Sequence, residues 1–215
     1  MNRLTILLIL GIVPLSLVAQ PNTNVISHYL FKDFSKAVVK MKGGRTESAL
    51  MNYNTVTEEM VFNQNNKMLA LTALETIDTI YLNNCVFIPV AKKFYELAYN
   101  GSIPLFVQHK SNLSSAGKPS GYGGTSQTSS ITNIASLSSG GAIYNLRLPE
   151  DFVVTNASMY WIKLNNKWCC FLNERQLTKI LPEKKEAIKS FVKAKKIDFD
   201  KADEVKSLIA LLNSK

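Results

Sequence analysis

Short apolar runs separated by turn residues recur about every ten residues from Lys36 to His109, and this rhythm limits the fold more than any other feature. Pairs of Asn and Gly stand between many of the runs, and these residues tolerate the positive φ angles of tight hairpins. The strands we expect are Ala37–Met41, Ser48–Tyr53, Glu59–Phe62, Met68–Leu71, Ile77–Leu82, Cys85–Val90, Phe94–Tyr99 and Ile103–His109. Short strands joined by short turns predict an antiparallel meander or a small barrel.

The chain changes from a strand period to a helical period after a last predicted hairpin, Met159–Leu164 and Lys167–Leu172. Asn173 is a candidate N-cap, with Gln176 three residues later. Apolar residues then recur at helical spacing, and Asp200 is a candidate cap for the last helix. Since an isolated amphipathic helix of this length is unstable, we expect two or three C-terminal helices packed on the sheet, an α+β fold.

Composition divides the chain into four regions. Residues 1–19 are a predicted signal peptide, and residues 20–110 are rich in predicted strands. Residues 111–141 are rich in Ser and Gly, which predicts a flexible loop or linker because such a segment buries little apolar surface. Residues 142–215 hold the hairpin and the helices, and we expect them to form one domain with residues 36–110.

The first nineteen residues have the three parts of a secretory signal. Arg3 gives a positive start, Leu4–Leu17 is apolar, and Ala19 is a small residue at a cleavage position. The apolar run is too short and too interrupted to span a bilayer, which takes about twenty residues. The sequence therefore predicts an exported protein, periplasmic or extracellular, with the signal peptide removed near Ala19.

The composition is that of an ordinary globular protein with a basic surface. Apolar residues make up 46% and charged residues 19%, and the formal net charge is +9. The charge is spread evenly along the chain, which argues against a nucleic-acid-binding stripe. We expect no nucleic-acid partner, and consider weak contact with an anionic envelope surface or with glycans.

The helical tail carries a resemblance to a known family. The segments are Leu177–Lys185, Ile188–Val192, Lys196–Phe199 and Leu208–Asn213, together with Tyr53-Asn54 and Met60–Phe62 upstream. They are similar to a family of small exported proteins of Bacteroidota that have a β-rich N-terminal part and a helical, Lys-rich tail. The resemblance implies a shared fold and export, and brings no activity or catalytic residue with it.

Three cysteines follow the predicted signal peptide: Cys85, Cys169 and Cys170. Cys169 and Cys170 are neighbours in a predicted strand, so their side chains should point to opposite faces. Buried free thiols are the first expectation, and a disulfide of Cys85 with Cys169 or Cys170 is the alternative if the strands are adjacent. No spacing of the zinc-binding kind occurs, and we expect neither a metal nor a cofactor.

Catalytic patterns are missing from the sequence. His28 and His109 are the two histidines, and we expect both to be exposed and structural. No GxSxG or comparable signature accompanies them, so no catalytic residue is assigned.

Two other features are candidates for surface roles. Tyr160, Trp161 and Trp168 crowd one hairpin and form a candidate binding surface, and Thr79 in Asp78-Thr79-Ile80 is a candidate for O-glycosylation.

These observations favour an exported, non-enzymatic module that binds a ligand or associates with the envelope. The alternative is a periplasmic hydrolase whose site is assembled only in three dimensions. A deep pocket with convergent His, Ser or carboxylate groups would favour the hydrolase, whereas a shallow or filled β surface would favour the binding module.

Overall fold

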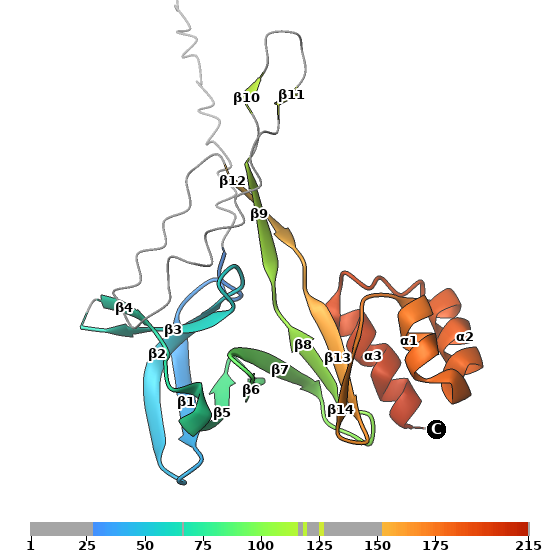
Figure 1. Ribbon diagram of the computed structural model, residues 1–215, viewed down its shortest axis with the longest axis horizontal. Helices are drawn as coiled ribbons and strands as arrows, with labels where there is room; N and C mark the ends of the chain where they lie inside the picture. The colour runs from blue at the N-terminus through green and yellow to red at the C-terminus, as the bar shows by residue number, and fades with distance from the viewer. Residues whose placement is uncertain (1–27, 66, 116–117, 120–124, 127–151, 215) are drawn as a thin grey trace, which may run out of the picture.

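The computed structural model describes residues 28–65, 67–115, 118–119, 125–126 and 152–214. Within these residues, one ten-stranded antiparallel sheet is followed by three α-helices, which confirms the α+β prediction (Figure 1). The predicted signal peptide, residues 1–19, lies outside the described part of the chain.

The large sheet is an open meander in which successive strands are added toward one edge from β1 to β4 and toward the other edge from β5 onward. Its strands are β1 (Ser35–Met41), β2 (Thr46–Asn54), β3 (Glu59–Gln64), β4 (Lys67–Ala70), β5 (Ile77–Leu82), β6 (Cys85–Val90), β7 (Lys93–Tyr99), β8 (Leu105–Gln108), β13 (Met159–Leu164) and β14 (Lys167–Phe171). They follow the order β14-β13-β8-β7-β6-β5-β1-β2-β3-β4. The chain returns from the β4 edge through a short 3-10 turn, Leu74–Thr76, to place β5 beside β1. Because β4 and β14 are the two edges of this sheet in the described part of the chain, the sheet is an open meander and not the small barrel that was the alternative.

The predicted Asn turns form as expected. Asn83 and Asn84 join β5 to β6 with φ angles of 50° and 63°. Asn165 and Asn166 join β13 to β14 with φ angles of 48° and 66°. Two consecutive positive φ angles are what a two-residue hairpin with the right twist needs, and Asn accepts them at low cost.

A two-stranded arm leaves the sheet where β8 ends and β13 begins (Figure 1). It consists of β9 (Ser111–Ser115) paired with β12 (Phe152–Asn156), and β10 (Lys118–Pro119) pairs with β11 (Thr125–Ser126) beyond it. The start of the predicted Ser/Gly-rich linker is therefore a strand, which corrects that prediction for Ser111–Ser115. Backbone pairing with β12 does not require apolar side chains, so the composition of the segment concealed it. Most of the rest of residues 111–141 lies outside the described residues.

The segment before β1 is held against β2. Leu30 N donates to Tyr53 O at 2.8 Å, and Tyr29 forms a bridge with Asn54. Asn52, a buried residue of β2, accepts from Phe31 N at 3.2 Å and donates to Phe31 O at 2.7 Å. The buried amide of Asn52 is thus satisfied by the backbone that covers it.

Two large apolar cores lie along the sheet, and a small third cluster forms around Val61 and Ala70 in the described residues. The N-terminal core is made by β1–β3 and β5–β7, and its buried side chains are Ala37, Val39, Met51, Tyr53, Met60, Ile77, Ile80, Leu82, Phe87 and Phe94. The C-terminal core lies between the helices and the strands β8, β13 and β14. It contains Ile103, Leu105, Val107, Tyr160, Ile162, Phe171, Leu177, Leu181, Ile188, Val205, Leu208, Ile209 and Leu212.

The helices are α1 (Glu174–Ile180), α2 (Lys185–Lys195) and α3 (Ala202–Asn213), with a 3-10 turn, Pro182–Lys184, between the first two. Asn173 caps α1 as predicted, because its side chain accepts from Gln176 N at 3.0 Å. Asp200 does not cap α3. The N-cap is Lys201, with no side-chain cap bond, while Glu204 accepts from Asp198 N at 2.7 Å.

The apolar stripes of the helices dock as expected, and a polar clamp fixes the end of α3. Asn213 Oδ1 accepts from Ile103 N and Ser102 Oγ, both at 2.8 Å, and Nδ2 donates to Ile103 O at 3.0 Å. A Cβ atom at Gly101 would lie 2.6 Å from Asn213 Oδ1, so glycine is required for this approach. The clamp ties the β7–β8 loop to the last helix.

Replacing Asn213 tests the clamp. We expect Asn213→Ala to lower the free energy of unfolding by about 2 kcal/mol, because it leaves part-buried backbone groups of Ile103 without partners. The matched control is Ser214→Ala, since the Ser214 hydroxyl donates only within its own helix end, to Leu211 O. Urea unfolding of both variants measures the difference, and equal stabilities would show that the clamp contributes nothing.

Candidate functional site

Four aromatic side chains gather on the sheet face opposite the helices, and we call Tyr95, Phe106, Trp161 and Trp168 the aromatic surface. They come from four adjacent strands, β7, β8, β13 and β14. The ring centroids of Tyr95 and Trp161 are 5.7 Å apart in a stacked arrangement, and those of Phe106 and Trp168 are 4.7 Å apart and edge-on. Tyr95 and Phe106 are buried whereas the two Trp side chains are half-buried, so the Trp rings form the outer layer.

A polar network supports this layer from one side. Trp161 Nε1 donates to Gln108 Oε1 at 3.1 Å, and Gln108 Nε2 donates to Glu58 Oε2 at 2.5 Å. Glu58, which is 6% exposed, also pairs with Lys93 at the start of β7. The network fixes the orientation of the Trp161 indole, because its only N–H is used.

One cation stands over the aromatic surface. Lys163 Nζ lies 5.7 Å from the centroid of the Trp168 ring, within the range of a cation–π contact. Lys163 is across the β13–β14 pair from Trp168. Among the described residues it forms no ion pair. Its charge is therefore available to a ligand.

Tyr160 does not belong to this surface, which corrects the sequence-based prediction. It is 1% exposed and stacks on Phe171 in the C-terminal core, with ring centroids 5.6 Å apart. Neighbouring residues of a strand point to opposite faces, so Tyr160 and Trp161 cannot share one. Burial, with smaller contributions from Asp200 and Asp198, raises the pKa of the Tyr160 hydroxyl to about 12.

The cysteines are separated by the topology. Cys169 packs against the C-terminal core, and Cys170 lies beside Trp161 on the other face, as the strand alternation predicted. Three strands, β7, β8 and β13, lie between Cys85 in β6 and this pair, so neither candidate disulfide is formed and all three thiols are free. Burial and the nearby Glu96 carboxylate raise the pKa of the Cys85 thiol to about 12, which makes it a poor nucleophile.

Thr79 is half-buried in β5, between β1 and β6. Its hydroxyl donates to Asp78 Oδ2 at 3.2 Å, and Asp78 pairs with Lys40 on β1 at 3.3 Å. Glycosylation at Thr79 stays a prediction, and this central position gives a modifying enzyme little access to the backbone.

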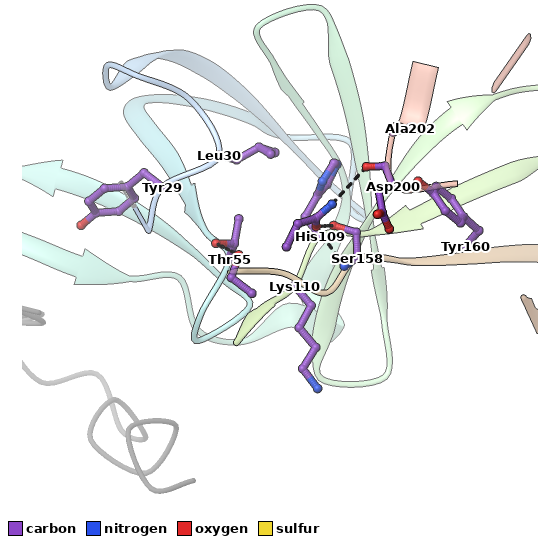
Figure 2. A pocket seen from close by; sticks show the side chains of 11 residues that line it. Tyr29, Leu30, Thr55, His109, Lys110, Ser158, Tyr160, Asp200 and Ala202 are labelled. Atoms are coloured by element: carbon purple, nitrogen blue, oxygen red, sulfur yellow. Dashed lines mark hydrogen bonds between the residues drawn. The ribbon is translucent and has the colours of Figure 1, made fainter. Parts of the chain in front are cut away.

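A pocket of about 260 Å³ lies where the two cores meet (Figure 2). We call it the junction pocket. It is bounded by the segment before β1, the end of β2, the root of the arm and the start of α3. Its lining residues are Tyr29, Leu30, Thr55, His109, Lys110, Ser111, Asn156, Ser158, Tyr160, Asp200 and Ala202.

His109 lies in the wall of this pocket with a carboxylate behind it. Its Nε2 is 2.5 Å from Glu96 Oε2 on β7, and the residue is 9% exposed, so the expectation of an exposed histidine is wrong. Burial alone would raise the pKa of Glu96. Hydrogen bonds from His109 and from the Cys85 thiol outweigh it and hold the pKa of this carboxyl below its usual value. The sequence offered no signal for this cluster because its members come from different strands, Cys85 from β6, Glu96 from β7 and His109 from the end of β8.

The hydroxyl groups of the pocket bond to other protein groups. Thr55 Oγ1 lies 2.9 Å from Ser111 Oγ and 3.0 Å from His28 O. Ser158 Oγ donates to Asn156 Oδ1 at 2.7 Å. In the described part of the chain, none of these hydroxyls is hydrogen-bonded to His109. The pocket thus holds an oriented imidazole but no nucleophile paired with it.

Two further observations bear on the site. Among the described residues, no three His, Cys, Asp or Glu side chains come together in a way that could hold a metal ion. The helices in the described ranges also lack the length and apolar character needed to cross a membrane.

Comparison with protein-family models, with curated proteins and with solved structures gives no match to this chain. The aromatic surface and the junction pocket are therefore interpreted from their own chemistry.

Glu96 should make stability depend on acid pH. Its pKa in the folded state is lowered by its partners. Its contribution to the free energy of unfolding is therefore fully present above the unfolded-state pKa, about 4.3, and is lost as the pH falls through the lower folded-state pKa. We expect Glu96→Gln to cost about 1–2 kcal/mol at neutral pH and to remove this part of the acid dependence. Urea unfolding between neutral and strongly acid pH measures it, with the exposed Glu47→Gln as control. Parallel pH profiles for wild type and Glu96→Gln would contradict the assignment.

Proposed function

We propose that the protein is exported and acts as a non-enzymatic binding module, which contacts its ligand through the aromatic surface. The observation that carries this proposal is the pair of half-exposed rings, Trp161 and Trp168, on the sheet face opposite the helices. Aromatic side chains supply much of the contact energy at binding surfaces because they are large and lose little conformational freedom. The buried Tyr95 and Phe106 hold the outer rings in place.

Carbohydrate is the ligand class that this chemistry supports best. The face of an indole ring carries partial negative charge, and the C–H groups on one face of a sugar ring carry partial positive charge. Lys163 above Trp168 adds a positive charge without a carboxylate partner among the described residues, which favours glycans with acidic substituents. The proposed partner is thus a glycan chain, neutral or acidic, of the kind found at cell envelopes.

The hydrolase alternative has less support. The junction pocket brings an oriented imidazole, His109, close to Ser111 and Ser158, which is part of what a hydrolase needs. A nucleophile activated by a base must be within hydrogen-bond reach of it, and the hydroxyls of Ser111 and Ser158 are hydrogen-bonded to Thr55 and Asn156 instead. Binding therefore explains more of the arrangement than catalysis does.

The export part of the proposal is tested at the N-terminus. We expect the protein recovered from the periplasm or the medium to begin near Gln20, because Arg3, Leu4–Leu17 and Ala19 form a complete signal. Leu8→Arg should keep the protein uncleaved in the cytoplasm by breaking the apolar run, whereas Thr5→Ser should not. N-terminal sequencing and cell fractionation give the answer. A wild-type protein that keeps Met1 and stays in the cytoplasm would overturn the proposal of export.

The binding part is tested by substitution on the aromatic surface. We expect Trp168→Ala and Trp161→Ala each to weaken glycan binding at least about tenfold, since each removes a contact ring. Leu50→Ala is the control, because Leu50 is 52% exposed on β2, six strands away from β13 in the sheet order. Binding of the mature chain to an array of neutral and acidic glycans is the measurement.

Lys163→Ala separates the charge from the rings and leaves both Trp side chains in place. We expect it to reduce binding to acidic glycans and to spare neutral ones. Melting temperatures of all variants show whether each still folds. If no glycan is retained by the wild type, or both Trp variants bind as well as wild type does, the proposal fails.

A further inference from the structure

We propose that the junction pocket is a second ligand site, separate from the aromatic surface, which takes a neutral hydroxyl-rich molecule of monosaccharide size. The two sites lie on opposite faces of the sheet, since the pocket contains Tyr160 from the helix-covered face and the aromatic surface contains Trp161. The volume, about 260 Å³, is just below the range of about 300–1,000 Å³ for drug-sized ligands. A single ring with its substituents therefore matches the space.

His109 gives the pocket a hydrogen-bond acceptor. Its Nε2 is engaged by the Glu96 carboxylate, which can only accept, so Nε2 carries a proton and the tautomer without charge has none on Nδ1. Nδ1 is then an acceptor, and it is the ring nitrogen left for the pocket that the residue lines. A ligand hydroxyl donates to such a nitrogen.

Ser111 gives the pocket a group that suits a hydroxyl in particular. The hydroxyls of Thr55 and Ser111 are 2.9 Å apart, and His28 O accepts from Thr55 at 3.0 Å. If Thr55 donates to His28 O, Ser111 donates to Thr55 and keeps free lone pairs. If Thr55 donates to Ser111, the Ser111 proton is free. A ligand hydroxyl fits both arrangements because it both donates and accepts.

The charges around the pocket select against an anion. The one lysine in its lining, Lys110, extends its ammonium away from the other lining residues (Figure 2). The acidic groups are Asp200 in the lining and Glu96 behind His109. An anionic ligand would meet these carboxylates without a cation directed at it, so a neutral ligand is favoured.

Apolar groups complete the match to a sugar ring. Leu30 and Ala202 line the pocket together with the rings of Tyr29 and Tyr160. A sugar presents C–H groups on its faces and hydroxyls around its edge, so it needs apolar contacts beside the polar ones. Leu30 belongs to the segment before β1 and Ala202 to α3, so a bound ring would contact both parts of the molecule.

The test is a set of NMR titrations of the mature chain, residues 20–215, with glucose, mannose and N-acetylglucosamine, and with sodium sulfate as the anion. We expect at least one of the sugars to shift the amide signals of Ser111, Asn156 and Ser158 with millimolar affinity, and sulfate to leave them unchanged. Ser111→Ala should weaken binding about five- to tenfold because it removes a hydrogen bond. Ala202→Phe should abolish it by filling the pocket. Lys110→Ala is the matched control and should bind within about twofold of wild type.

Each result decides the proposal. Shifts at the pocket that disappear in Ala202→Phe and persist in Lys110→Ala support it. Shifts confined to the indole signals of Trp161 and Trp168 would overturn the pocket proposal while leaving the aromatic surface as the glycan site. No shift with any of the three sugars, an equal loss in Lys110→Ala, or displacement of the sugar by sulfate would also overturn it. Loss of glycan binding in the Trp variants with intact pocket shifts would show that the two sites are independent.

Discussion

The buried carboxylate of Glu58 is the interaction on which the arrangement of this molecule depends. It lies in the turn between β2 and β3 with a φ of 60°, and it reaches both Lys93 at the start of β7 and Gln108 at the end of β8. These contacts close the N-terminal strands onto the middle of the sheet. Gln108 in turn holds the Trp161 indole, while His109, the next residue, lines the junction pocket. One carboxylate therefore connects the β2–β3 turn, β7, β8 and the Trp161 indole, and its burial makes its partners necessary.

Much of the local structure was predictable from the sequence because local chemistry determines it. The Asn83-Asn84 turn forms because two adjacent positive φ angles suit Asn, and α1 begins at Asn173 because its side chain accepts from Gln176 N. The apolar spacing that includes Ile188 predicted a helix face, and that face is buried in the C-terminal core. Each of these depends on residues within a few positions of one another.

Most of the parts that sequence reasoning missed depend on contacts between segments that are separate in the sequence. The pairing of β13 with β8 decides which strands separate Cys85 from Cys169 and Cys170, and no local pattern contains that order. His109 is buried because Glu96 and the rings of Tyr53 and Phe87 surround it. Tyr160 is a different case. Strand alternation alone places Tyr160 and Trp161 on opposite faces of β13, and Trp168 lies on the same face as Trp161. The burial of Tyr160 was therefore predictable once it was known which face the helices cover.

The clamp at Asn213 has a consequence for how the protein matures. Its partner Ile103 is 110 positions earlier in the chain, and the C-terminal core combines β8 with α3 across a similar separation. A chain that emerges from the ribosome from its N-terminus cannot complete this core until α3 has been made. Contacts between such distant segments also form slowly, because a long loop must close first. For the export proposed above this delay is useful, since the half of the sheet that the helices cover stays incomplete while the chain is still being made and so does not obstruct its passage.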